Sequence, residues 1–166
     1  MRYLLLAGCC WLTYFALAQG PKPRVLNSRS TALFEGLTTD LDPDHLVSLY
    51  RTDLKLSRVR PNRHEPALKD SIMVVATPTD QLSLLKNRYK ALLYSATITS
   101  DKISFAGMHI GVSKEQFCRA LHLSPAYEVY AFTDGMENFG QLRCTFTGGK
   151  LKSVQYKQLV NLEAID

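Results

Sequence analysis

The chain is poor in the residues and motifs that usually reveal a catalytic or metal site. Its 166 residues include four histidines, four cysteines and one tryptophan. The histidines are far apart in the sequence, and no HExxH, GxSxG or phosphate-binding glycine loop occurs. The sequence therefore predicts neither a metal site nor a cofactor, and we expect no enzymatic activity.

One pairing of a nucleophile with a base is present. Cys118 and His122 are four residues apart, which places them on neighbouring turns if this region is helical. Such spacing is common by chance, and no third group that would orient the histidine is evident. We therefore favour a structural interpretation of both residues.

The N-terminal segment 1–18 has the composition of a secretory signal peptide. Arg2 supplies a positive charge, residues 3–15 are almost wholly apolar, and Ala16-Leu17-Ala18 forms a cleavage motif of the A-x-A type. Cleavage between Ala18 and Gln19 would release an exported protein. The sequence thus predicts a periplasmic or secreted location.

Two alternatives would keep the chain attached to a membrane. The apolar run could stay as an uncleaved N-terminal anchor, although it is shorter than the ~20 residues of a typical span. Leu6-Ala7-Gly8-Cys9 has the form of a bacterial lipobox, in which Cys9 would carry lipid. The strongest apolar stretch follows Cys9, whereas a lipoprotein normally becomes polar there. We therefore prefer cleavage after Ala18.

Cleavage would leave two cysteines, Cys118 and Cys144, in an exported chain. A disulfide between them would close a loop of about 26 residues and stabilise the fold by about 3–4 kcal/mol in the chain-entropy model. Both positions are also compatible with buried free thiols that act as small apolar residues. The sequence leaves both alternatives open.

The net charge of +5 is modest, but basic residues concentrate between Leu54 and Pro66. Pro61 and Pro66 argue against regular structure, so we expect a basic loop. Its interpretations are a patch for phosphate, lipid headgroups or acidic glycan, or a solvated loop, and we prefer the loop. No aromatic residue lies within it, so base stacking is unsupported and we expect no nucleic-acid partner. The cations are Lys55, Arg58, Arg60 and Arg63, together with His64.

The clearest local signal is a helix over residues 113–123. Ser113 and Gln116 have the spacing of a capping box, and Val112 and Phe117 have that of a hydrophobic staple. Pro125 disfavours helical geometry in the residue before it, so the helix should end near Leu123. A helix of about three turns is marginal alone and must pack against a partner.

Alternating apolar residues on both sides of this helix predict β-strands. Gly148-Gly149 is a hairpin turn of the kind that requires positive φ. We expect strands over 71–77, 81–85, 89–98, 103–110, 127–133, 141–147 and 150–156. The last three would form a meander, and the two strands over 89–98 and 103–110 would form a hairpin.

The expected fold class is α+β, with an antiparallel sheet meander packed against one or two short helices. After the signal peptide, residues 19–66 would be a lead segment without clear periodicity. It would contain the basic loop and a short helix over 43–54, which begins with an Asp42 cap and Pro43. Residues 67–166 would form the α+β domain.

The region from about residue 110 to 156 resembles small bacterial envelope proteins of the SmpA/OmlA type. Gly111-Val112-Ser113-Lys114-Glu115-Gln116-Phe117 resembles the opening motif of that group. The strands over 127–132 and 142–146, with Gly149-Lys150-Leu151 and Val154, are similar to its later strands and hairpin. The group shares the fold of the β-lactamase inhibitor protein and includes a small lipoprotein of the outer-membrane assembly machine.

The resemblance implies an exported, non-enzymatic protein-interaction module of the bacterial envelope. The alternatives are a secreted inhibitor of a hydrolase and a protein that binds an anionic ligand through the basic loop over 55–64. A protein partner is expected in the first two cases. The sheet residues proposed to be exposed for binding are Tyr130, Arg143, Lys152 and Tyr156.

Overall fold

The computed structural model describes residues 23–62, 64–135 and 140–159. The predicted signal peptide over 1–18, its Ala18/Gln19 junction, the possible lipid site Cys9 and the basic residue Arg63 lie outside these ranges.

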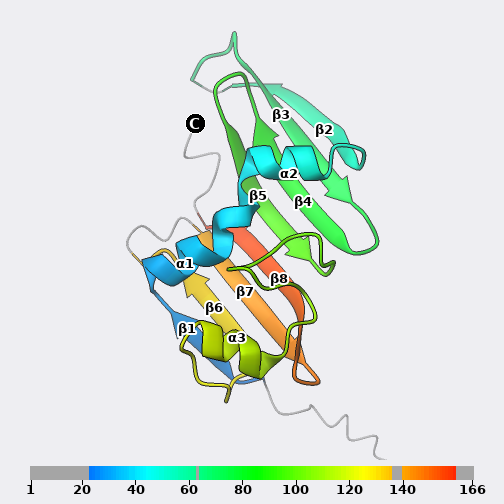
Figure 1. Cartoon of the computed structure of the whole chain (residues 1–166). Helices are drawn as coiled ribbons and strands as arrows, with labels where there is room; N and C mark the ends of the chain where they lie inside the picture. Colours follow the sequence, from blue (N-terminus) through cyan, green and yellow to red (C-terminus); the bar gives the residue numbers. More distant parts are fainter. Residues whose placement is uncertain (1–22, 63, 136–139, 160–166) are drawn as a thin grey trace, which may run out of the picture.

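The described residues form one eight-stranded sheet in the order β1-β6-β7-β8-β5-β4-β3-β2 (Figure 1). Neighbouring strands are antiparallel except β1 and β6, which are parallel. The strands are β1 (Val25–Ser28), β2 (Leu54–Pro61), β3 (Lys69–Ala76), β4 (Asp80–Lys86), β5 (Ala91–Ile98), β6 (Val129–Thr133), β7 (Gly140–Thr147) and β8 (Lys150–Gln158).

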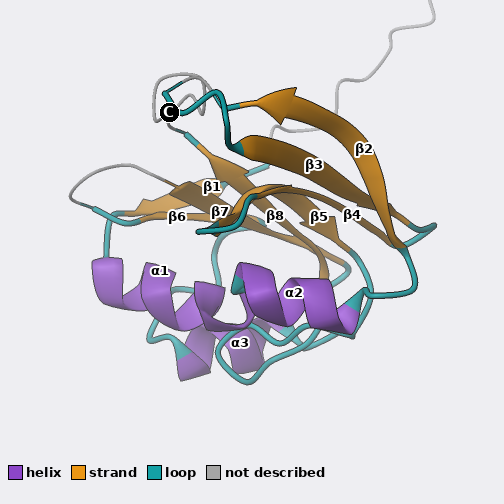
Figure 2. Ribbon diagram, turned by 90° about the horizontal axis from the view of Figure 1, so that it is seen from above, coloured by secondary structure: helices purple, strands orange, loops and turns teal. Residues whose placement is uncertain are grey.

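Three short α-helices lie on the same side of this sheet (Figure 2). They are α1 (Thr31–Thr38), α2 (Pro43–Leu49) and α3 (Lys114–Ala120), and a 3-10 turn, η1 (Thr39–Leu41), joins the first two. About 45% of the described residues are in strands and 19% in helices. The predicted α+β class is therefore wrong: the protein has a mainly-β fold built on a mixed sheet.

Each helix begins at a residue that satisfies the free N–H groups of the first turn. Ser113 Oγ accepts from Gln116 N at 3.2 Å, which confirms the predicted cap of α3. Asp42 Oδ1 accepts from the backbone N–H groups of Asp44 and His45 at the start of α2. Two helices are shorter than predicted, because α2 ends at Leu49 and α3 at Ala120.

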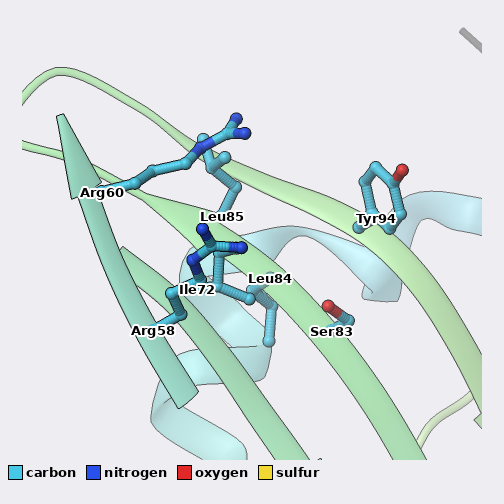
Figure 3. A pocket seen from close by; sticks show the side chains of 7 residues that line it. All are labelled: Arg58, Arg60, Ile72, Ser83, Leu84, Leu85 and Tyr94. Atoms are coloured by element: carbon cyan, nitrogen blue, oxygen red, sulfur yellow. The ribbon is translucent and has the colours of Figure 1, made fainter. Parts of the chain in front are cut away.

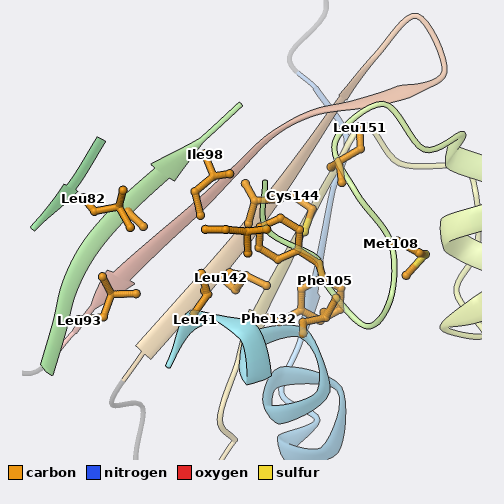
Figure 4. Close-up of a cluster of buried hydrophobic side chains, with 14 of the residues drawn as sticks. Leu41, Leu82, Leu93, Ile98, Phe105, Met108, Phe132, Leu142, Cys144 and Leu151 are labelled. Atoms are coloured by element: carbon orange, nitrogen blue, oxygen red, sulfur yellow. The ribbon is translucent and has the colours of Figure 1, made fainter. Parts of the chain in front are cut away.

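The hydrophobic core lies between the sheet and the helices (Figure 4). Alternate residues of β7, namely Leu142, Cys144 and Phe146, point into it, as the sequence predicted. Phe117 of α3 is fully buried against Phe146, with ring centroids 5.1 Å apart. This packing holds α3 on the sheet, because a helix of 7 residues is not stable alone.

The predicted lead segment over 19–66 is part of the same sheet. It supplies both edge strands, β1 and β2, and also the helices α1 and α2. The expectation of a basic loop is wrong over residues 54–61, which form β2. Pro61 is compatible with this strand because it occupies the last position of an edge strand.

The predicted strand over 103–110 is also wrong. Ile103, Phe105 and Met108 are buried, but the segment is a looped connection with one isolated bridge between Phe105 and Met108. Ala106 and Gly107 have φ values of 52° and 76°, which no β-strand accommodates. The segment contributes apolar side chains to the core without pairing in the sheet.

The predicted meander is confirmed, since β6, β7 and β8 are consecutive neighbours. The hairpin between β7 and β8 turns at Gly148 and Gly149, with φ values of 58° and 72°. Both values lie in the left-handed region that favours glycine, as the predicted primed turn requires.

Candidate anion-binding groove

The second face of the sheet, which we call the uncovered face, has no described helix over it (Figure 2). Its residues follow from the register, because neighbours of core residues along a strand point the other way. On β7 and β8 the paired Arg143 and Gln155 point outward, as do Gln141 and Lys157. Leu85, Val129 and Ala131 are buried but do not belong to the helix-side core cluster, in agreement with this assignment.

The strands are strongly biased towards positive charge. Their only carboxylates are Asp70 and Asp80, and both are fully buried. The α-helices, in contrast, carry the acidic residues Glu35, Asp44 and Glu115. The strands carry nine basic residues: Lys55, Arg58, Arg60, Lys69, Lys86, Arg143, Lys150, Lys152 and Lys157.

A pocket of about 210 Å³ opens on the uncovered face between β2 and β5 (Figure 3). Arg58 and Arg60 are two residues apart on β2, so both point to this side, and Tyr94 of β5 stands across from them. The remaining lining residues are Ile72, Ser83, Leu84 and Leu85. The pocket thus has a cationic wall, an aromatic wall and a largely apolar floor.

Arg60 is held at the pocket by the buried carboxylate of Asp70. The ion pair joins Arg60 Nε to Asp70 Oδ2 at 4.0 Å. The side-chain amides of Asn62 and Asn87 donate to the same carboxylate, at 3.2 Å and 3.0 Å at closest. Asp70 therefore ties the β2–β3 and β4–β5 turns to the edge of the pocket.

Arg58 differs from Arg60 because it forms no ion pair with any described residue and its side chain is exposed. A bulge between Leu56 and Arg58 shifts the register of β2 against β3. Bulges redirect side chains at sheet edges and commonly occur next to binding sites. Arg58 is the group of the pocket best placed to gain a new anionic partner.

A second hollow of about 280 Å³ lies beside the pocket on the sheet. The two hollows share Ser83 of β4. On the uncovered face the second hollow is lined by Val74, Gln81, Ser83, Ser95 and Thr97. We call the two adjacent hollows together the basic groove.

The four sheet residues predicted to form one exposed binding surface, Tyr130, Arg143, Lys152 and Tyr156, do not lie together in the structure. Tyr130 is fully buried, which excludes it from direct contact with a partner. Its hydroxyl donates to the Ser124 carbonyl at 2.7 Å, and burial raises its pKa. The prediction failed because both faces of β6 are buried, and Tyr130 lies with Phe132 on the face that belongs to the helix-side core.

Tyr156 is also on the helix side, where it is half-buried. A Cβ at Gly140 would lie 3.0 Å from the Tyr156 hydroxyl oxygen, so the tyrosine packs directly on this glycine. Burial, and after it the negative charge of Asp134, raise the pKa of Tyr156. Arg143 and Lys152 are exposed as predicted, but only Arg143 is in register with the uncovered face.

The two cysteines Cys118 and Cys144 are buried free thiols in this structure. The Cys118 thiol donates to the Tyr130 hydroxyl oxygen at 3.1 Å. Burial raises the pKa of Cys144. His122, four residues after Cys118 in the sequence, has a positive φ of 54° and an exposed side chain just after α3.

A second buried carboxylate, Asp80, holds the fold together on the helix side. It accepts from Tyr50 Oη at 2.8 Å, from Ser100 Oγ at 2.6 Å, and from the backbone N–H groups of Thr99 and Ser100 at 3.0 Å. Burial alone would raise the pKa of Asp80, but these hydrogen bonds outweigh it and lower the pKa below its usual value. All its acceptor positions serve the fold, so Asp80 is a structural residue.

Within residues 23–62, 64–135 and 140–159, no cluster of His, Cys, Asp or Glu has the geometry to hold a metal ion. Among the same residues no helix has the length and apolar character needed to cross a membrane. Comparisons with protein-family models, with curated protein sequences and with solved structures found no match to this chain. The likeness to the SmpA/OmlA type stays a prediction.

The sequence analysis predicted Arg58 and Arg60 as binding residues but did not identify Tyr94 and Ser83, which also line the pocket. These residues belong to β5 and β4, which are far from the basic stretch in the sequence. Alternation along β5 could not have placed Tyr94, because it would put Tyr94 on the face of the core residue Ala96. The register shift between Ser83 and Leu84 leaves Tyr94 without a paired residue on β4 and allows it to point to the other face. Nothing local indicates that β5 lies across from β2.

Proposed function

We propose that this chain is a non-catalytic binding protein that takes an anionic ligand on the uncovered face of its sheet. The observation that carries the proposal is the pairing of Arg58 and Arg60 on one wall of a pocket whose other wall is Tyr94. A guanidinium forms bidentate hydrogen bonds with carboxylate or phosphate. The ligand group that fits has a negative charge on a compact apolar or aromatic body.

The volume of the pocket limits the size of that group. About 210 Å³ is below the about 300–1,000 Å³ that is typical of drug-sized ligand sites. One ring or one short branch fills it, with the anion at the arginines and the apolar part over Ile72 and Leu85. The proposed role is recognition, since the groups that line the pocket include no carboxylate, thiol or imidazole.

The proposal keeps the cellular setting predicted from the sequence. An exported envelope protein with a cationic recognition face would bind an anionic partner outside the cytoplasm. The support for export is the composition of residues 1–18, and the support for an interaction role is the resemblance around residues 110–156. The anionic partner would bind to the basic groove.

The test is isothermal titration of the purified protein with phenyl phosphate, whose ring and anion match the pocket. We expect Arg58→Ala to weaken binding at least tenfold, because an exposed charge-assisted contact to a bound anion is lost. Arg119→Ala is the matched control, since Arg119 is an exposed arginine on α3. Phenol, the neutral analogue, should bind far more weakly. Equal loss in both variants, or no loss in either, would refute the site.

A further inference from the structure

We infer that the basic groove accommodates an extended acidic polysaccharide that crosses the strands. This inference rests on the proposed function and specifies its ligand class. It adds the requirement that one ligand contacts cations on β2 and on β8, at the two sides of the groove, whereas the pocket alone requires only one anionic group.

The strand register aligns a row of side chains across the groove. Lys55 of β2 is opposite Val74, and Val74 is opposite Ser83. Ser83 is opposite Ser95, and Ser95 is opposite Lys157 of β8. The row therefore has one lysine on β2 and another on β8, with small residues on the three strands between them. Four strand spacings of about 4.8 Å separate the two lysine strands by about 19 Å.

The neighbouring rows add further cations, each at one end only. Arg58 and Arg60 lie on the β2 side beside Lys55, and Arg143 lies on the β7 side beside Lys157. Among the described strands, the acidic residue on this face is Asp70. It is buried, and its carboxylate already interacts with Arg60, Asn62 and Asn87, so no free carboxylate of these strands faces the groove. A ligand that spans the groove must carry negative charge at intervals along its length.

The floor of the groove favours a ligand rich in hydroxyl groups. Ser83, Ser95, Thr97 and Gln81 present hydroxyls and an amide, each able both to donate and to accept. Tyr94 is 41% exposed and offers a ring face against which a sugar can lie. The hydroxyl groups of uronic-acid sugars match the floor, and their carboxylates match the cations.

The groove is less suited to two other kinds of anionic partner, an acidic peptide and a layer of anionic lipid. A peptide strand cannot add to β3, β4, β5 or β8, because each already has neighbours on both sides. A lipid layer needs exposed apolar side chains to insert, and the second hollow exposes small polar ones instead. An acidic polysaccharide is therefore the occupant that the groove fits best.

The experiment compares galacturonate with a long oligogalacturonate by isothermal titration of the whole chain. We expect the oligomer to bind at least tenfold more tightly per molecule, because several contacts are made by one linked ligand. Lys157→Ala should weaken oligomer binding at least threefold and leave phenyl phosphate binding unchanged. Arg58→Ala should weaken both. Lys150→Ala, an exposed lysine of β8 outside the row, is the control and should change neither.

The outcomes separate this inference from the proposed function. Suppose that phenyl phosphate binds in an Arg58-dependent way. If the oligogalacturonate then binds no more tightly than galacturonate, or if Lys157→Ala does not weaken its binding, the inference of a polysaccharide ligand is wrong, whereas the anion-binding pocket remains supported. If neither ligand binds, both proposals fail. Polyglutamate or phosphatidylglycerol vesicles that bind as tightly as the oligomer would overturn the ligand class, whereas weaker binding of both supports it.

Discussion

The guanidinium of Arg60 lies 4.0 Å from the carboxylate of Asp70, measured from Nε to Oδ2, at the edge of the candidate site. Asp70 is fully buried, whereas the Arg60 side chain is 26% exposed. Asp70 is thus part of the protein interior, whereas Arg60 reaches the surface. The ion pair fixes the direction in which Arg60 points and connects the stability of the β2 edge to the geometry of the pocket.

Asp70→Ala should lower the free energy of unfolding by about 2–4 kcal/mol, because the buried amide of Asn62, the half-buried amide of Asn87 and a partly buried guanidinium lose their common acceptor. Urea denaturation measures this change. Asp101→Ala removes an exposed carboxylate and is the control, with an expected change within about 0.5 kcal/mol. A similar small change for Asp70→Ala would show that the network does not hold the turns.

Asp80 should make the stability of the protein sensitive to acid. Its pKa is lowered in the folded state, so its contribution is present above the unfolded pKa near 4 and is lost as the pH falls through the folded pKa. Asp80→Asn should destabilise the protein by about 2–4 kcal/mol at neutral pH, since four hydrogen bonds to a charged acceptor are altered.

The measurement is urea denaturation of wild type and Asp80→Asn between neutral pH and about pH 3. The variant should lose less stability on acidification than wild type does. Tyr50→Phe is a milder probe of the same site, because it removes one of the hydrogen bonds to Asp80 Oδ2. Parallel pH profiles for wild type and Asp80→Asn would contradict the assignment.

Ser113→Ala should cost about 1 kcal/mol of stability through the loss of the N-cap of α3. Thermal unfolding followed by circular dichroism would detect it. Ser48→Ala replaces an exposed serine within α2 and should have little effect. If the two variants melt together, the cap of α3 does not stabilise the packed helix.

Cys118 and Cys144 should resist alkylation in the native protein, because their exposed fractions are 2% and 0%. Iodoacetamide labelling followed by peptide mass mapping resolves each cysteine. Both should react in denaturant without reductant, as free thiols do. Labelling that requires prior reduction would instead establish the disulfide that the sequence left open.

The local parts of the fold could be predicted from sequence because short-range chemistry determines them. Ser113 and Gln116 identify the start of α3, Asp42 and Pro43 that of α2, and Gly148-Gly149 the last hairpin turn. The strict alternation of Leu142, Cys144 and Phe146 identified β7 because one face of that strand is buried and the other is not. These signals operate within a few residues.

The long-range parts could not be predicted, for physical reasons specific to each segment. β1 has four residues, and its parallel pairing with β6 connects positions more than 100 residues apart. β2 is an edge strand in which most side chains are exposed, so no buried face imposes alternation on its charged sequence. The segment over 103–110 has the apolar content of a strand, but the left-handed backbone at Ala106 and Gly107 excludes one.

The difference between local and long-range signals also explains which residues of the site could be predicted from the sequence. A concentration of cations around residues 55–64 was visible, and the structure places Arg58 and Arg60 on one wall of a pocket. The opposite wall comes from β5, and only the sheet order β5-β4-β3-β2 brings it within reach. A pocket assembled from non-adjacent strands has no local sequence signature.

The most direct test of the central claim is a titration of the isotopically labelled protein with phenyl phosphate, followed by backbone amide chemical shifts. We predict that the shifts that move belong to β2–β5 around the pocket, including Arg58, Ile72, Ser83 and Tyr94, and that those of α3 stay unchanged. Movement confined to the helices, or no movement at millimolar ligand, would contradict an anion-binding site on the uncovered face.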